Sequence, residues 1–125
     1  MSSLKDRIKD HNDTKWEAVP IPEWGEGVVL YVRNTTHEEK IQWELSLASK
    51  TRDGKVKTSL QQAQYKMVSL VTFEQEGGAT PFFTPGDWQW VKGKGSGPIQ
   101  KLFDTAIRLS GVSNTDVDEL FENLT

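Results

Sequence analysis

The chain has 125 residues, 35% of them apolar, and a formal net charge of −3, which favours one small globular domain with a lean core. The absence of cysteine excludes disulfide scaffolds, thiolate zinc sites and cysteine nucleophiles. The acidic balance argues against general nucleic-acid binding, which needs a net basic surface. No apolar run is long enough to span a membrane, and the polar start predicts no signal peptide. We therefore expect a protein of the reducing cytoplasm that binds neither nucleic acid nor membrane.

The N-terminal part predicts a helical turn and then a β-hairpin. Residues 4–12 are polar and carry only Leu4 and Ile8 as apolar partners, so we expect a flexible segment over residues 1–13 and a single domain over 14–125. Residues 16–21 have strand character, but two prolines restrict them to an edge strand or an extended arm. Residues 23–27 predict a turn, and residues 28–33 are the best strand in the sequence. The spacing favours an antiparallel hairpin.

A helix over residues 36–49 is predicted by the Thr36–Glu39 capping box. Its apolar residues fall on two faces. The main stripe contains Ile41, Leu45 and Ala48, while Trp43 and Leu47 project roughly opposite. Such a helix is either sandwiched in the core or presents one side to a partner.

The middle of the chain predicts a core helix that begins at Ser59. Its apolar residues recur at a helical period, namely Leu60, Ala63, Met67, Val68, Leu70 and Val71. Residues 67–73 are also compatible with a strand, because valine and phenylalanine are enriched there, but the helical period covers more positions. Residues 74–80, which contain two consecutive glycines, predict a loop.

The C-terminal part predicts further helices. Pro85 begins a short one with Trp88 and Val91 on one side and Trp90 on another. A longer amphipathic helix begins at Pro98 and ends at Gly111, and a last helix is predicted over residues 113–124. The predicted fold class is therefore α+β: an N-terminal antiparallel β-hairpin followed by four to five α-helices packed in a single small domain.

Motifs for chemistry are absent from the sequence. The His37–Glu38 pair lacks the second histidine of a zinc-protease motif, because position 41 is isoleucine. The glycines of residues 93–97 lack the spacing of a phosphate-binding loop. We predict no catalytic, cofactor-binding or metal-ligating residues and no enzymatic activity.

Tryptophan supplies the candidate binding residues instead. Trp43 and Trp90 depart from the main apolar faces of their helices, and interface hot spots favour tryptophan. Together with Leu47 and Trp88 they are the candidate partner-binding residues. The alternative for Trp43 and Trp90 is a second packing surface inside the protein.

The serial order of these segments resembles the tail assembly chaperones of long-tailed, siphovirus-type bacteriophages and prophages. The resemblance covers roughly residues 14 to 124. It consists of a Val-Pro-Ile-Pro-Glu-Trp-Gly arm at 19–25, a strand ending in arginine at 28–33, a charged helix start at 35–40, an acidic glycine loop at 74–78, Phe-Phe-Thr at 82–84 and closing helices at 102–109 and 117–124. Two features depart from the family pattern: Lys40 stands where arginine is common, and the Trp88, Trp90 and glycine-rich stretch is unusual.

The resemblance implies a non-enzymatic role in the cytoplasm of the infected or lysogenic host. Such chaperones bind the tape measure protein, keep it soluble, assist tail-tube polymerisation around it and are absent from the mature virion. Many also exist in a longer form, made by ribosomal frameshifting, whose added tail recruits the tail tube protein. Self-association through the same apolar faces is a further expectation. The alternative is a structural tail-completion or head–tail joining protein of the virion, and a small enzyme or regulator acting on host proteins is a third class.

Overall fold

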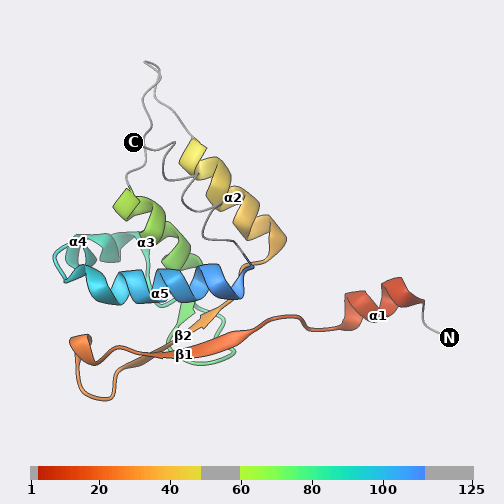
Figure 1. Ribbon diagram of the computed structural model, residues 1–125, viewed down its shortest axis with the longest axis horizontal. Helices are drawn as coiled ribbons and strands as arrows, with labels where there is room; N and C mark the ends of the chain where they lie inside the picture. Colours follow the sequence, from red (N-terminus) through yellow and green to blue (C-terminus); the bar gives the residue numbers. More distant parts are fainter. Residues whose placement is uncertain (1–2, 49–59, 112–125) are drawn as a thin grey trace.

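The computed structural model describes residues 3–48 and 60–111, which form a three-stranded antiparallel sheet with helices packed on one face (Figure 1). The predicted α+β class with an N-terminal hairpin is confirmed. The elements in chain order are α1 (Leu4–Asp10), β1 (Trp16–Pro20), the 3₁₀ helix η1 (Pro22–Trp24), β2 (Val29–Arg33), α2 (His37–Ala48), α3 (Leu60–Val71), β3 (Thr72–Phe73), the 3₁₀ helix η2 (Pro85–Asp87), α4 (Trp88–Val91) and α5 (Ser96–Leu109).

The sheet has the order β1-β2-β3, so β1 is an edge strand, as Pro20 within it and Pro22 just after it predict. In the hairpin Trp16 lies opposite Arg33 and Pro20 lies opposite Val29. The turn between these strands contains Gly25 and Gly27 at φ values of +137° and +77°, a region that side chains with a Cβ rarely adopt. The hairpin therefore depends on glycine at both positions.

The segment 67–73, which is compatible with helix or strand, contains both. The helix α3 continues to Val71, and only Thr72 and Phe73 pair with β2. The helix preference is thus correct for most of the segment. The strand brings Phe73 against the edge of Trp16 at a ring-centroid distance of 5.4 Å.

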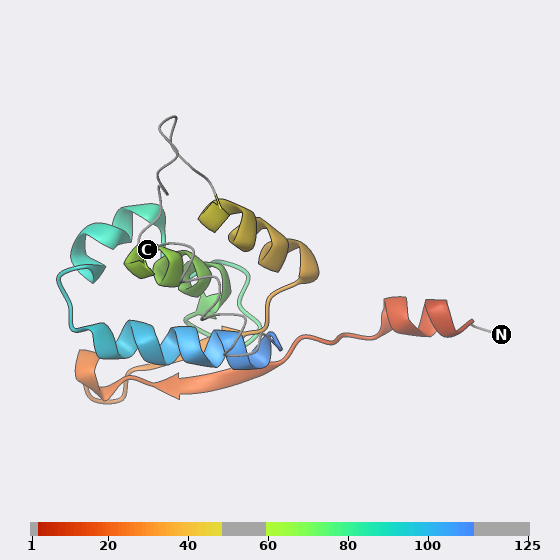
Figure 2. The ribbon, with the colours of Figure 1, turned by 45° about the horizontal axis from the view of Figure 1, so that its top comes forward.

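The core lies between the sheet and two helices. Helix α5 packs against β1, β2 and α3, and it lies between the sheet and α3 in both views (Figures 1 and 2). Its apolar residues Phe103 and Ile107 are buried, and the polar residue Thr105 is buried as well. The Thr105 hydroxyl donates to the Lys101 carbonyl, which satisfies it inside the helix. Gly111 ends this helix at φ +74°, as expected.

The capping box that begins α2 is confirmed. The Thr36 N–H donates to Glu39 Oε1 at 2.9 Å, and the Glu39 N–H donates to Thr36 Oγ1 at 3.1 Å. The assignment of this helix's faces, however, is wrong. Trp43 is buried in the core, whereas Ile41 and Leu45 of the expected main stripe are exposed.

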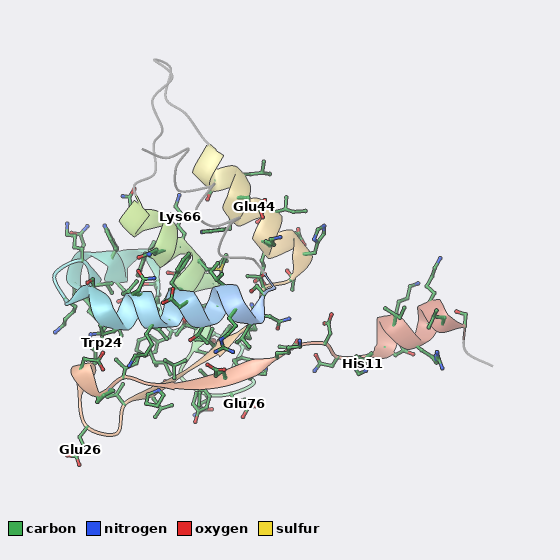
Figure 3. All side chains as sticks on the ribbon, in the orientation of Figure 1. His11, Trp24, Glu26, Glu44, Lys66 and Glu76 are labelled. Carbon is green, nitrogen blue, oxygen red and sulfur yellow. The ribbon has the colours of Figure 1, made fainter. Side chains whose placement is uncertain are left out.

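The N-terminal helix α1 stands away from the domain. It has no buried residue, and Figures 1 and 2 show it at the end of an extended segment on the right. Its side chains, and His11 beyond its end, point into open space (Figure 3). That residues 1–13 are flexible stays a prediction. The predicted last helix over 113–124 lies outside the described residues, so the domain boundaries 14–125 also stay a prediction.

Candidate partner-binding surface

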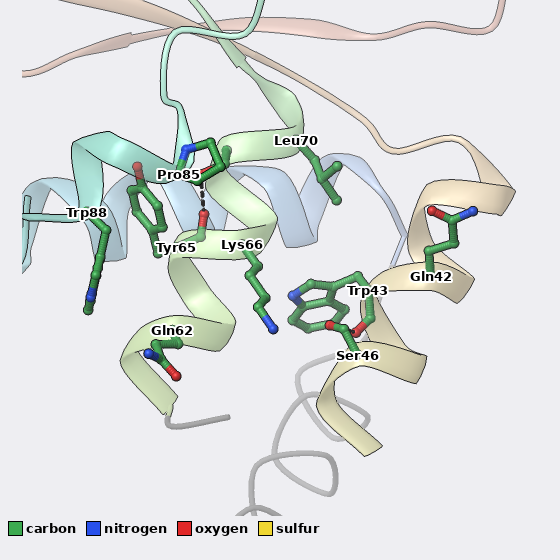
Figure 4. Close-up of a pocket in the computed structure, with 10 residues that line it drawn as sticks. Gln42, Trp43, Ser46, Gln62, Tyr65, Lys66, Leu70, Pro85 and Trp88 are labelled. Atoms are coloured by element: carbon green, nitrogen blue, oxygen red, sulfur yellow. Dashed lines mark hydrogen bonds between the residues drawn. The ribbon is translucent and has the colours of Figure 1, made fainter. Parts of the chain in front are cut away.

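Two grooves on the surface carry the candidate binding residues. The first, called here the α3 groove, lies over α3 between α2 and the segment that begins α4, and has a volume of about 730 Å³. Figure 4 shows Trp43 on one side of it and Trp88 on the other, with α3 between. Its lining residues come from three helices and the turn before α4: Gln42, Trp43, Ser46, Gln62, Tyr65, Lys66, Ser69, Leu70, Pro85 and Trp88.

Trp43 forms part of the core and contributes only an edge to the α3 groove. Its side chain is 2% exposed, and its ring contacts Phe103 at a centroid distance of 6.2 Å. Its indole N–H donates to the Ala63 carbonyl of α3 at 2.9 Å, so the polar atom of this large ring is satisfied inside the protein. Trp43 therefore holds α2 against α3 and offers almost no surface to a partner.

Tyr65 and Trp88 form the opposite side of the α3 groove. Their rings are tilted against each other at 5.1 Å, and the Tyr65 hydroxyl donates to the Thr84 carbonyl at the start of η2. Burial raises the pKa of the Tyr65 hydroxyl, which keeps it protonated as a donor. The Ser69 hydroxyl donates to the Tyr65 backbone carbonyl at 2.7 Å, drawn as a dashed line in Figure 4. Since both ends of Tyr65 are held, this side of the groove is preorganised.

The second groove, called here the aromatic groove, has a volume of about 800 Å³ and lies where the hairpin turn meets α4 and the start of α5. Its lining residues are Glu23, Trp24, Val28, Phe82, Trp90, Lys94, Gly95, Gly97 and Pro98. The rings of Trp24 and Trp90 meet edge-on at 6.0 Å, and each lies about as far from buried Phe83. The groove thus exposes part of a continuous aromatic cluster.

Asp87 fixes Trp90 at the rim of the aromatic groove. Its carboxylate accepts the Trp90 indole N–H at 2.9 Å and also accepts the backbone and side-chain donors of Thr84 at 2.9 and 3.0 Å. The hydrogen bond from Trp90, followed by those from Thr84, holds the pKa of Asp87 below its ordinary value. Trp90 is 42% exposed but oriented, because one end of its ring is hydrogen bonded and one face is packed.

Arg33 joins the groove-forming helices to the sheet. Its guanidinium donates to both carboxylate oxygens of Glu39 at 2.8 and 2.9 Å and to the carbonyls of Asn34 and Leu70 at 2.9 and 3.3 Å. Its hydrogen bonds hold the pKa of Glu39 below its ordinary value, although burial opposes them. One cation therefore ties β2 to the start of α2 and the end of α3.

The structure places three of the four predicted binding residues, in two different grooves. Trp43 and Trp88 line the α3 groove, Trp90 lines the aromatic groove, and the side chain of Leu47 lies outside the described residues. The sequence reasoning missed Tyr65 and Phe82. A signal for Phe82 was present, because neighbouring residues of an extended segment point to opposite sides, so only one residue of Phe-Phe can enter the core.

Metal-binding clusters and membrane-spanning helices are both absent from the part of the chain that the structure describes. There, no group of three or more histidine, aspartate or glutamate side chains lies close enough together to hold a metal ion. None of the described helices combines the length and the apolarity that crossing a membrane requires.

Comparisons with known proteins bear on the fold. No protein-family model matches the chain, and no curated protein matches it either. Among solved structures, the bacteriophage HK97 tail assembly chaperone matches with a TM-score of 0.51 and 18% sequence identity, over 77% of this chain and 85% of that one. The chain therefore has the fold of a siphovirus-type tail assembly chaperone.

Proposed function

We propose that this protein is a phage tail assembly chaperone that binds the tape measure protein, keeps it soluble and assists polymerisation of the tail tube around it. The observation that carries the proposal is the fold shared with the HK97 tail assembly chaperone over 77% of the chain. The order of the sequence segments, from the Pro-Glu-Trp-Gly arm to the closing helices, supports the same role independently of the structural comparison. The role is one of binding without catalysis, in the host cytoplasm.

The two grooves suit a long, apolar, helical partner. An amphipathic helix binds by laying its apolar residues into a groove with apolar walls and a polar rim. The α3 groove has such a wall, formed by the rings of Tyr65 and Trp88 together with Leu70, and its lining also includes the polar side chains of Gln42, Gln62 and Lys66. Each groove exceeds the lower end of the range for small-ligand pockets, about 300 Å³, so either accepts several side chains of a helix.

Co-expression with the tape measure protein, which is long and helical, tests the proposal. The expected result is that the long protein becomes soluble and co-purifies with the chaperone, whereas alone it sediments with aggregates. A long protein that stays insoluble in the presence of the chaperone would contradict it.

Variants locate the binding surface. We expect Trp88→Ala to weaken co-purification if the tape measure protein uses the α3 groove, and Trp90→Ala to weaken it if it uses the aromatic groove. Tyr31→Ala is the matched control, because Tyr31 is a half-buried aromatic residue of β2 that lines neither groove. Melting temperatures of all three variants separate loss of binding from loss of folding. If both the Trp88→Ala and the Trp90→Ala variants bind the tape measure protein as strongly as the wild type does, both grooves are excluded.

Mass spectrometry of purified virions tests the assembly role. A chaperone is released before the particle is complete, so we expect the protein in infected cells and not in mature particles. Its abundance in particles would favour a structural tail-completion or head–tail joining protein. Search of the same extracts for a longer, frameshifted product tests whether a long form with an added C-terminal tail exists.

A further inference from the structure

We propose that α1 of one copy docks on the exposed face of α2 of a second copy, so that this protein self-associates through its N-terminal arm. The arm is defined here as residues 3–15, which include α1 and the extended segment after it. The inference does not depend on the identity of the tape measure partner, because it concerns contacts between copies of this chain alone.

The arm carries an apolar pair that the domain does not cover. Leu4 and Ile8 are 64% and 66% exposed, and their i,i+4 spacing places them on one face of α1. The Ser3 hydroxyl caps the helix by accepting the Asp6 N–H at 3.1 Å. A helix of seven residues is marginal in water even with a cap, because nucleation is costly and few hydrogen bonds follow. Docking of its apolar face on another surface would stabilise it.

Asn34 directs the arm away from its own domain. Its side-chain oxygen accepts the Lys15 N–H at 2.9 Å, and its side-chain nitrogen donates to the Asp13 carbonyl at 3.4 Å. The Asn12 side chain adds a turn by accepting the Thr14 N–H at 3.0 Å. These bonds fix the backbone where the arm leaves β1, and Figures 1 and 2 show α1 far from α2 of the same chain. This geometry favours a receptor on another copy.

The outer face of α2 presents a matching apolar pair. Ile41 and Leu45 are 41% and 64% exposed and have the same i,i+4 spacing as the pair on α1. This exposure follows from the burial of Trp43, which lies nearly opposite on the helix. Two short helices with aliphatic pairs at the same spacing can pack side by side with the four side chains between them.

The charges beside the two pairs are complementary. At about 100° per residue, Lys5 and Arg7 lie on either side of the apolar pair of α1. On α2, the carboxylates of Glu38 and Glu44 lie on either side of Ile41 and Leu45, and Figure 3 labels Glu44 on this helix. Glu44 already contacts Lys40 at 3.6 Å in an exposed pair, which leaves its carboxylate accessible to a second cation. The arm thus offers two cations where the receptor offers two anions.

Sedimentation velocity of the purified protein over a range of concentrations tests the proposal. A contact made by four aliphatic side chains is small, so we expect weak, concentration-dependent association that falls as salt rises. Two double variants remove the apolar pairs: Leu4→Ser/Ile8→Ser and Ile41→Ser/Leu45→Ser. Each should raise the concentration needed for association at least tenfold. The melting temperature should change little, because the four residues are exposed. A wild-type protein that is monomeric at every concentration, or serine variants that associate unchanged, would overturn the proposal.

Charge exchange distinguishes docking between copies from docking within one chain. Lys5→Glu/Arg7→Glu and Glu38→Lys/Glu44→Lys should each fail to self-associate, whereas an equimolar mixture of the two should form a heterodimer. Lys9→Glu/Lys92→Glu is the matched control, with the same change in net charge away from the flanks of the apolar pair, and it should associate like the wild type. No heterodimer in the mixture, or equal loss in the control, would refute docking between copies. Because no tape measure protein is present, failure here leaves the proposed function standing.

Discussion

The structure predicts that Trp43→Ala destabilises the protein much more than Trp90→Ala does. Truncation of a buried tryptophan costs about 3–5 kcal/mol, of which the lost indole hydrogen bond to Ala63 accounts for about 1 kcal/mol. A domain of this size has a total stability of about 5–15 kcal/mol, so the variant should lose a large fraction of it. Trp90 is 42% exposed, and its truncation should cost about 1 kcal/mol.

Urea unfolding followed by far-ultraviolet circular dichroism measures both costs without depending on tryptophan fluorescence. Trp43→Phe is the graded control, because it keeps an aromatic ring in the core and removes the N–H donor. We expect its loss of unfolding free energy to fall between the wild type and Trp43→Ala. A loss below about 1 kcal/mol for Trp43→Ala, together with weaker co-purification of the tape measure protein, would refute the core assignment and restore Trp43 as a binding residue.

Three further predictions concern single polar groups. The hydrogen bonds from Arg33 depress the pKa of Glu39 in the folded protein, so the ionised carboxylate stabilises the fold. This stabilisation should be complete above the ordinary glutamate pKa of about 4.3 and should be lost as the pH falls below it. The difference in unfolding free energy between the wild type and Glu39→Gln should therefore shrink as the pH falls through about 4. Asp87→Ala should lower the melting temperature at neutral pH and lower it less near pH 3, because the depressed pKa of Asp87 gives the same sign; equal losses at both values would contradict the role of its charge. Thr72→Val should raise the unfolding free energy by about 1 kcal/mol in a urea titration, because the buried Thr72 hydroxyl finds no hydrogen-bond partner among the described residues.

The local elements were predictable because local chemistry determines them. Thr36 and Glu39 fix the start of α2 through hydrogen bonds three residues apart, and the prolines of the first strand exclude it from the centre of a sheet. The amphipathic period of α5 likewise predicts its buried face. None of these features depends on a distant residue.

The orientation of α2 could not be predicted from its own sequence. Its apolar residues fall on two stripes, and the buried stripe packs on parts of the chain that are distant in sequence. The Trp43 ring contacts Phe103, and its indole N–H donates to the carbonyl of Ala63, 20 residues away. Thr105 gives a second example: burial of this polar residue is tolerated because its hydroxyl donates to the Lys101 carbonyl. The division of the candidate tryptophans between two grooves likewise depends on how distant segments pack together, which the sequence of each helix does not show.

The burial of Trp43 also separates the two proposed activities in space. With Trp43 turned inward, the α3 groove lies on one side of α2, and Ile41 and Leu45 lie on the outer side that the arm is proposed to contact. The aromatic groove is formed by other segments, namely the hairpin turn, α4 and the start of α5. A copy engaged through its arm therefore keeps both grooves accessible. If both proposals hold, serial contacts between arms and outer faces would place grooves at intervals along a long partner, and the avidity of several weak sites would exceed that of one. The Leu4→Ser/Ile8→Ser variant should then bind a short tape-measure fragment like the wild type and solubilise the full-length protein less well.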